Sequence, residues 1–221
     1  MSKTRSSNSK QNFKNNTYPG LFLILEFIIL AGSFALSRSR LTWLLEVFPI
    51  LLGLPVLVIT YKRFQLTNLV YFFLIMHSLI LSVGGIYTYA EVPLGFWMQD
   101  LFGFARNHYD RIGHFAQGFI PALLARELLL RTSPLRSGKW LNFIVISICM
   151  FISASYELIE FGYTVGIGAS AESFLGTQGD VWDAQWDMTF ALIGAIVSLT
   201  LMQGIQDRFL KRIGINPRYN E

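Results

Sequence analysis

Charged side chains are scarce in this sequence. Asp, Glu, Lys and Arg make up 14% of its 221 residues while hydrophobic residues make up 52%, and the mean hydropathy is +0.44. A soluble domain carries about 25% charged residues, so the composition excludes water as the main solvent. The net charge of +4 does not indicate a nucleic-acid partner, because basic residues in a membrane protein mark its cytoplasmic loops.

Cysteines and repeats are also lacking. The single cysteine, Cys149, lies inside an apolar run. With one cysteine no intrachain disulfide is possible, so cysteine usage does not indicate whether the protein faces an oxidising or a reducing compartment. The sequence contains no internal repeat and no soluble domain between its apolar runs. One compact helical bundle is therefore the simplest arrangement.

Six apolar runs are long enough to cross a bilayer, which takes about 20 helical residues. They are Leu21–Leu36, Trp43–Thr60, Thr67–Tyr89, Asp110–Leu130, Trp140–Gly166 and Ala184–Gly204. The sequence therefore predicts an all-α fold, a polytopic transmembrane bundle of about six helices. We expect residues 1–19 to be a disordered cytoplasmic tail, residues 20–207 to be the transmembrane domain and residues 208–221 to be a basic cytoplasmic tail.

The basic residues predict the orientation. With an even number of spans, fourteen of the eighteen Lys and Arg residues fall on the side of the termini, and the other side keeps Arg38, Arg40, Arg106 and Arg111. Both termini are therefore predicted to be cytoplasmic. The basic start and the apolar stretch from Leu21 also fit a cleaved signal peptide, and the sequence leaves this alternative open.

The ionisable residues of the front half are isolated. Glu26 and Glu46 stand alone near helix ends or in the bundle interior, and His77 lies in the middle of the third span. For such a histidine, a hydrogen bond between helices is the favoured interpretation. Further along, Glu127 and Arg131 are four residues apart, which predicts a surface ion pair.

Two other features are structural. Ala191, Gly194, Ala195 and Ser198 form a small-residue face on the sixth span, which predicts that another helix approaches closely. The stretch Val92–Phe104 is too short to span a membrane, and we expect it to lie along the outer interface.

Acidic residues and histidines gather in the back half, where nine of the fourteen acids lie between residues 100 and 187. Spacings of three or four residues put the members of each group on one helical face. Because the spans alternate in direction, all three groups fall at one depth, near the extracytoplasmic interface. The groups are Asp110 with His114, Glu157 with Glu160, and Asp180 with Asp183 and Asp187.

Six carboxylates at one depth need a counter-charge. Two of them about 5 Å apart repel by roughly 3 kcal/mol at an effective dielectric of 20, and Arg106 and Arg111 balance only two. A divalent cation supplies the remainder, with Mg, Mn or Ca favoured by oxygen ligands and Zn permitted by one histidine. The predicted ligands are Asp110, His114, Glu157, Glu160, Asp180, Asp183 and Asp187.

Within this group, the predicted catalytic residues are His114, Glu157 and Asp187. Glu157 and Asp187 lie inside apolar runs, where an ionisable side chain indicates function. Asp110, Asp180 and Asp183 fit helix N-caps equally well, and shared protons are an alternative to the ion.

Three motifs resemble the YjdF-type inner-membrane proteins of bacteria, a family without an established reaction. They are Arg106–Phe119, Tyr156–Glu160 and Gly176–Met188, and the resemblance runs from about Leu21 to the end. A looser similarity connects them to VanZ-like proteins, which also have an Asp–His pair opening one helix, a Glu on the next and an Asp opening the last. The resemblance implies a multi-pass protein of the bacterial inner membrane, with membrane lipid as its neighbour.

Three functions fit these observations. The first is metal-assisted hydrolysis or transfer on a lipid or envelope headgroup at the outer face, although the sequence lacks GxSxG and HExxH motifs. The second is an ion- or proton-coupled permease that uses the same carboxylates, although an internal repeat and a broken helix pair are both lacking. The third is a non-catalytic membrane factor whose polar cluster fixes helix packing.

Overall fold

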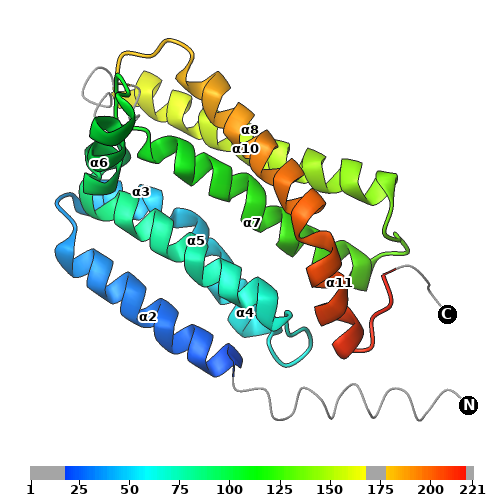
Figure 1. The fold of residues 1–221 in the computed structure, drawn as a ribbon. Helices are drawn as coiled ribbons and strands as arrows, with labels where there is room; N and C mark the ends of the chain where they lie inside the picture. Colours follow the sequence, from blue (N-terminus) through cyan, green and yellow to red (C-terminus); the bar gives the residue numbers. More distant parts are fainter. Residues whose placement is uncertain (1–17, 168–177, 218–221) are drawn as a thin grey trace, which may run out of the picture.

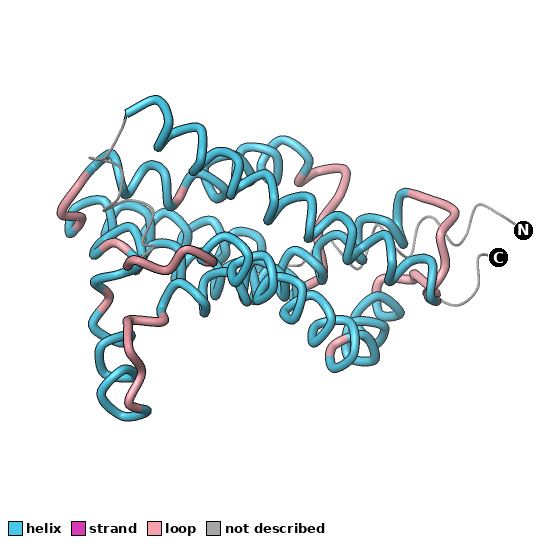
Figure 2. Tube along the Cα trace, turned by 90° about the horizontal axis from the view of Figure 1, so that it is seen from above, coloured by secondary structure: helices cyan, strands magenta, loops and turns pink. Residues whose placement is uncertain are grey.

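The computed structural model describes residues 18–167 and 178–217. Within these ranges the secondary structure is helical, and no strand occurs (Figure 2). The elements are α2 (Tyr18–Leu36), α3 (Arg40–Glu46), α4 (Phe48–Thr60), α5 (Asn68–Tyr87), η1 (Tyr89–Glu91), α6 (Pro93–Phe102), α7 (Tyr109–Thr132), α8 (Lys139–Ile167), α10 (Asp183–Leu201) and α11 (Gln203–Arg212). The expected tail at residues 1–19 lies almost wholly outside the described residues, as do residues 218–221.

Four of these helices are long and apolar enough to cross a membrane, namely α2, α5, α8 and α10. The all-α prediction is confirmed in this coarser form, as several apolar membrane helices. The fourth expected run is α7, whose 24 residues are sufficient in length but include five charged side chains, Asp110, Arg111, Arg126, Glu127 and Arg131.

The second expected run is not one continuous helix, so the prediction that a broken helix pair is lacking is wrong. Its residues form α3 and α4, which meet at Val47 with a bend of 55°. The break has a local cause, because Pro49 lacks the N–H that would bond to the Leu45 carbonyl in an unbroken helix. That carbonyl instead accepts a hydrogen bond from the Tyr156 hydroxyl of α8 at 2.9 Å.

The central helix of the bundle is α7, which packs against α5, α8 and α10 (Figure 1). Its closest neighbour is α10. A Cβ atom on Gly118 would overlap the Ala191 carbonyl, and one on Gly194 would overlap the Phe115 carbonyl. The prediction of a close helix approach at the small-residue face of the sixth span is thereby confirmed.

The charged residues of the lower half of α7 are buried and paired. Arg126 is fully buried and contacts Asp207 at 2.6 Å and the Gln206 amide oxygen at 3.0 Å, both on α11. Leu210 of α11 is also fully buried. The expected domain boundary at residue 207 therefore falls inside a packed helix.

The Glu127–Arg131 pair exists at 2.7 Å, but its prediction as a surface pair is wrong. Glu127 is 0% exposed, and its carboxylate accepts hydrogen bonds from the Thr67 amide at 2.8 Å and the Thr67 hydroxyl at 2.6 Å. Thr67 is the N-cap residue of α5. The carboxylate thus satisfies free N–H donors at a helix start and joins α5 to α7.

Candidate functional site

The three predicted groups lie at one end of the bundle. Figure 1 shows the start of α7, the end of α8 and the start of α10 together, next to the short helix α6. Asp110 and His114 belong to the first two turns of α7, Glu157 to the second half of α8, and Asp183 and Asp187 to the first two turns of α10. The alternating direction of the helices therefore produces the common depth that the sequence predicted.

A buried Asp–His–Asp group forms the centre of the site. His114 Nε2 lies 3.4 Å from Asp110 Oδ1 and 3.8 Å from Asp187 Oδ2, and one ligand atom from each of the three residues lies within 4.8 Å of the others. Glu157 Oε1 approaches the other ring nitrogen, Nδ1, at 3.9 Å. All three members of the group are less than a tenth exposed.

Two polar atoms of this centre have no hydrogen-bond partner among the described residues, namely His114 Nδ1 and Glu157 Oε1. The Gln117 side-chain oxygen, one turn further along α7, is also without a partner. An unsatisfied buried polar group costs about 1–3 kcal/mol. Such a concentration of unused donors and acceptors is typical of a site completed by water, an ion or a ligand.

Two arginines hold Asp183 and Asp187 of α10 and Asp180 just before it. Arg111 contacts Asp187 Oδ1 at 2.6 Å with one nitrogen, and Asp180 and Asp183 at 3.2 Å with the other. Arg106 adds a contact to Asp183 at 2.7 Å. Asp180 and Asp183 are thus ion-paired with arginine, whereas the second carboxylate oxygen of Asp187 faces His114.

Glu160 has a different environment from Glu157. It lines a cavity of about 730 Å³ between α4, α5, α7 and α8, together with Glu46, Asp110 and His114. Glu46 is 5% exposed, so a fourth chain segment, the end of α3, contributes an acid to this end of the bundle.

Sequence reasoning missed Glu46, although a signal was present. The second expected span runs inward, so Glu46 near its start lies at the same depth as the three groups. Tyr156 was also missed, and its hydrogen bond to Leu45 holds α8 against α3 beside Glu46. Seven carboxylates then share this end of the bundle with Arg106, Arg111 and His114, and they are Glu46, Asp110, Glu157, Glu160, Asp180, Asp183 and Asp187.

The segments that enter the site are held by partly buried hydrogen bonds. The Asn107 amide donates to the Gln178 side-chain oxygen at 3.1 Å, and the Gln178 side-chain amide donates to the Asn107 carbonyl at 2.9 Å. This reciprocal pair ties the approach to α10 to the start of α7. His108, at the N-cap of α7, contacts the Phe104 ring with its own ring. Burial and the neighbouring Arg106 and Arg111 lower the pKa of His108.

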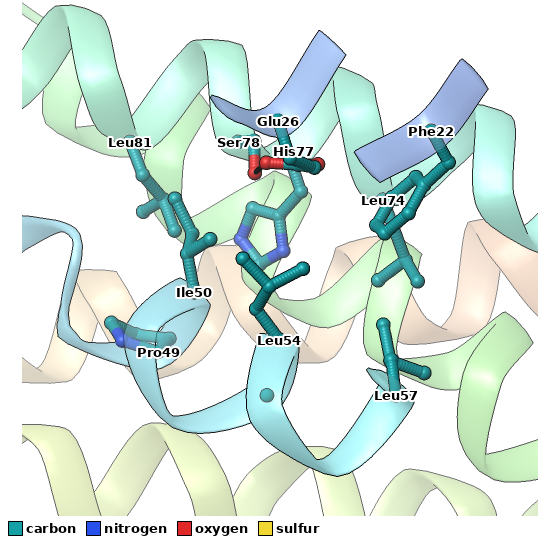
Figure 3. A pocket seen from close by; sticks show the side chains of 11 residues that line it. Phe22, Glu26, Pro49, Ile50, Leu54, Leu57, Leu74, His77, Ser78 and Leu81 are labelled. Atoms are coloured by element: carbon teal, nitrogen blue, oxygen red, sulfur yellow. Dashed lines mark hydrogen bonds between the residues drawn. The ribbon is translucent and has the colours of Figure 1, made fainter. Parts of the chain in front are cut away.

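A second polar position lies deeper in the bundle. Ser78 of α5 donates a hydrogen bond to the Glu26 carboxylate of α2 at 2.6 Å, and both residues line a small cavity of about 80 Å³ against α4. Figure 3 shows the His77 ring pointing into this cavity, near Ile50 and Leu54. Its Nε2 has no hydrogen-bond partner among the described residues, so that atom does not supply the predicted interhelical hydrogen bond.

The central group has the chemistry of a divalent-metal site. Ligand atoms bound to one ion at about 2.1 Å lie roughly 3.0–3.4 Å from each other, close to the 3.4 Å and 3.8 Å separations of His114 from its two aspartates. Two carboxylates and one imidazole leave further coordination positions open. Such openness distinguishes catalytic from purely structural sites.

Fold and site together define an all-helical integral membrane protein with a buried acidic group at one end. A family model described as "Predicted membrane protein (DUF2238)" matches residues 18–208, and the chain belongs to this family. It is 45% identical over 179 residues to "Inner membrane protein YjdF" of Escherichia coli (strain K12), covering 81% of this chain and 86% of that protein. No solved structure matches the chain. The resemblance to YjdF-type proteins is confirmed, and the one to VanZ-like proteins stays a prediction.

Proposed function

We propose that this protein binds one divalent cation through Asp110, His114 and Asp187, and that the ion serves hydrolysis or transfer on a lipid or envelope headgroup. The observation that carries the proposal is the juxtaposition of these three buried side chains within 4.8 Å. A second observation supports it, because His114 Nδ1 and Glu157 Oε1 are buried without partners beside the group.

The surroundings assign a role to each neighbour. Arg111 holds one oxygen of Asp187 at 2.6 Å and so orients the other oxygen toward the ion, as an outer hydrogen bond does in many metal sites. Glu157 lies within reach of His114 and is the group proposed to take a proton from an attacking water. In hydrolysis the water oxygen bonds to the phosphoryl or acyl centre, the headgroup oxygen leaves, and the proton returns to it. Glu160, Asp180 and Asp183 are then outer acids of the site.

We propose that this chemistry lies at the outer face of the membrane. We propose six spans, in which α3 and α4 form one broken span and α7 is the fourth. Charges on α7 are tolerated because they face the bundle interior and are paired. The distribution of basic residues then puts both termini in the cytoplasm and the acidic end outside.

Metal analysis of the purified protein tests this function. Wild-type protein in detergent, supplied with Mn²⁺ or Zn²⁺ and then desalted, is expected to retain about one ion per chain, because two carboxylates and an imidazole provide charge and ligands. Asp187→Asn and His114→Ala are each expected to lose it. Asp100→Asn, on exposed α6, is the matched control for removal of one acid. Retention of the ion by both site variants would contradict the proposal.

A specific observation favours the permease as a second candidate. The break between α3 and α4 supplies the interrupted helix that the sequence did not reveal, and such breaks line ion paths in transporters. Glu46 lies directly at the break. Cation or proton flux in liposomes that is abolished by Glu46→Gln would favour the permease over the enzyme.

A further inference from the structure

The large cavity beside the acidic group extends along the membrane. Its wall on α7 includes Asp110, His114, Gln117, Pro121, Leu128 and Thr132. These residues recur at intervals of three to seven on one helical face, and the 22-residue separation of the first and last spans about 33 Å. The hydrocarbon core of a bilayer is about 30 Å thick. The cavity is therefore a groove that crosses most of the membrane.

The opposite wall of this groove is α4, which packs poorly for a membrane helix. None of its residues is buried, although Leu52, Val56 and Thr60 face the groove. Close packing is the rule in protein interiors and between membrane helices. A groove of about 730 Å³ beside this loosely packed helix therefore requires a filling, and its largely apolar wall favours hydrocarbon over water as that filling.

The two ends of the groove differ in chemistry. The inner part is lined by aliphatic and aromatic side chains such as Leu128 and Phe64, whereas the outer end holds Glu46, Asp110 and Glu160. Among the described lining residues no Lys or Arg occurs. A phosphate entering this end by itself would meet three carboxylates and no basic side chain other than His114. A cation at Asp110 and His114 changes that, because phosphate oxygens readily occupy the open positions of a divalent ion.

We propose that the groove holds one hydrocarbon chain of a membrane lipid, with a phosphate headgroup bound at the outer end through the divalent ion. This inference rests on the proposed metal site, because Asp110 and His114 belong both to that site and to the groove wall. It names the substrate class as a phosphate-bearing long-chain lipid. The chain enters from the bilayer alongside α4, and its phosphate reaches the ion.

Photo-crosslinking in nanodiscs tests the inference. The probe is phosphatidic acid with a diazirine in one acyl chain, and diacylglycerol with the same chain is the phosphate-free comparison. With Mn²⁺ present, phosphatidic acid is expected to label groove residues such as Val56 and Leu128. Chelation of the ion should lower that labelling about tenfold, because the phosphate then faces three carboxylates with no basic side chain other than His114. Diacylglycerol labelling should not respond to chelation.

Two variants close the groove without touching the metal ligands. Val56→Trp, on the unburied face of α4, and Leu128→Trp on α7 are each expected to reduce groove labelling about fivefold by filling its volume. Phe143→Trp on the opposite, exposed face of α8 is the control and should change nothing. Labelling of Phe143 itself reports general lipid contact in every sample.

The outcomes separate the two proposals. The lipid inference would be overturned, and the metal site left intact, if the protein retained the ion but the groove showed no preferred labelling. Crosslinks across the groove to a second copy of the chain would have the same meaning. Groove labelling that ignores the ion would overturn the phosphate assignment. Absence of ion binding in wild-type protein would overturn the proposed function first and the phosphate assignment with it.

Discussion

Arg111 separates the acids of this site into those that contact only arginine and the one that also faces His114. The two terminal nitrogens of its planar guanidinium point in fixed directions, one toward Asp187 and one toward Asp180 and Asp183. The planar fork matches carboxylates in a way that the single ammonium of lysine does not. Asp187 is thereby fixed with one oxygen toward Arg111 and the other toward His114. The same side chain neutralises part of the cluster and orients a proposed ligand.

Arg111→Lys is expected to destabilise the protein although the charge is kept, because one ammonium reaches fewer of the three carboxylates. Disturbing a buried ion-pair network of this kind costs several kcal/mol, roughly 3–5 when a partner is lost outright. Thermal unfolding in detergent should show a clearly lower midpoint, together with ion affinity lowered about 10- to 100-fold.

The control is Arg38→Lys, in the exposed pair of Arg38 with Glu91. An exposed pair contributes at most about 1 kcal/mol, so its midpoint should stay near that of the wild type. Equal midpoints for the Arg111 and Arg38 variants would show that the fork has no structural role.

At the scale of elements, the contact of α7 with α10 sets the geometry of the site. Gly118 and Gly194 let the two backbones approach until no side chain fits between them. Gly118→Ala is expected to destabilise the bundle by about 1–3 kcal/mol, because the added methyl overlaps the Ala191 carbonyl and pushes the helices apart. Since Asp110 and Asp187 belong to these two helices, ion affinity should fall as well.

Gly162→Ala on α8 is the matched comparison. Its added methyl meets nothing within 4 Å, and alanine favours a helix over glycine by about 1 kcal/mol. The unfolding midpoint should therefore stay level or rise. A rise in both variants would mean that the close contact between α7 and α10 is not required.

The connection between α5 and α7 depends on one buried carboxylate. Glu127→Ala removes three hydrogen bonds at once and leaves the Arg131 guanidinium, held against the Phe64 ring at 3.7 Å, without its acid. A loss of about 3–5 kcal/mol is expected from breaking a buried pair, measured as a lower unfolding midpoint. Glu91→Ala, in the exposed pair, should leave the midpoint nearly unchanged.

At the scale of the whole molecule, the proposed six-span topology predicts which surfaces face which side. Cysteine introduced at exposed Asp100 on α6 should react with a membrane-impermeant maleimide in intact spheroplasts, because this end faces outward. Cysteine at exposed Arg136, between α7 and α8, should react only after the membrane is opened. Native Cys149 is fully buried and serves as the internal blank. The reverse pattern would invert the orientation.

Much of this architecture is readable from local sequence. Apolar runs of about 20 residues predict helices that cross the bilayer because unpaired backbone groups are too costly in hydrocarbon. Successive helices cross the membrane in alternating directions, and this predicted that Asp110, Glu157 and Asp187 lie at one depth. The depth of a residue depends only on its position along its helix and on the direction of that helix. The small-residue face around Gly194 likewise predicted a close neighbour.

Rotation and pairing were decided only by the tertiary structure. Depth does not say toward which neighbour a side chain points, so the sequence did not separate Asp180 and Asp183, which contact arginine, from Asp187, which also faces His114. It treated Glu46 as isolated and Glu127 as exposed, because Thr67, which covers the Glu127 carboxylate, lies 60 residues away in the chain and Asp110, which shares a cavity with Glu46, belongs to a distant helix. Long-range packing sets which acids meet, and that depends on how helices rotate against one another.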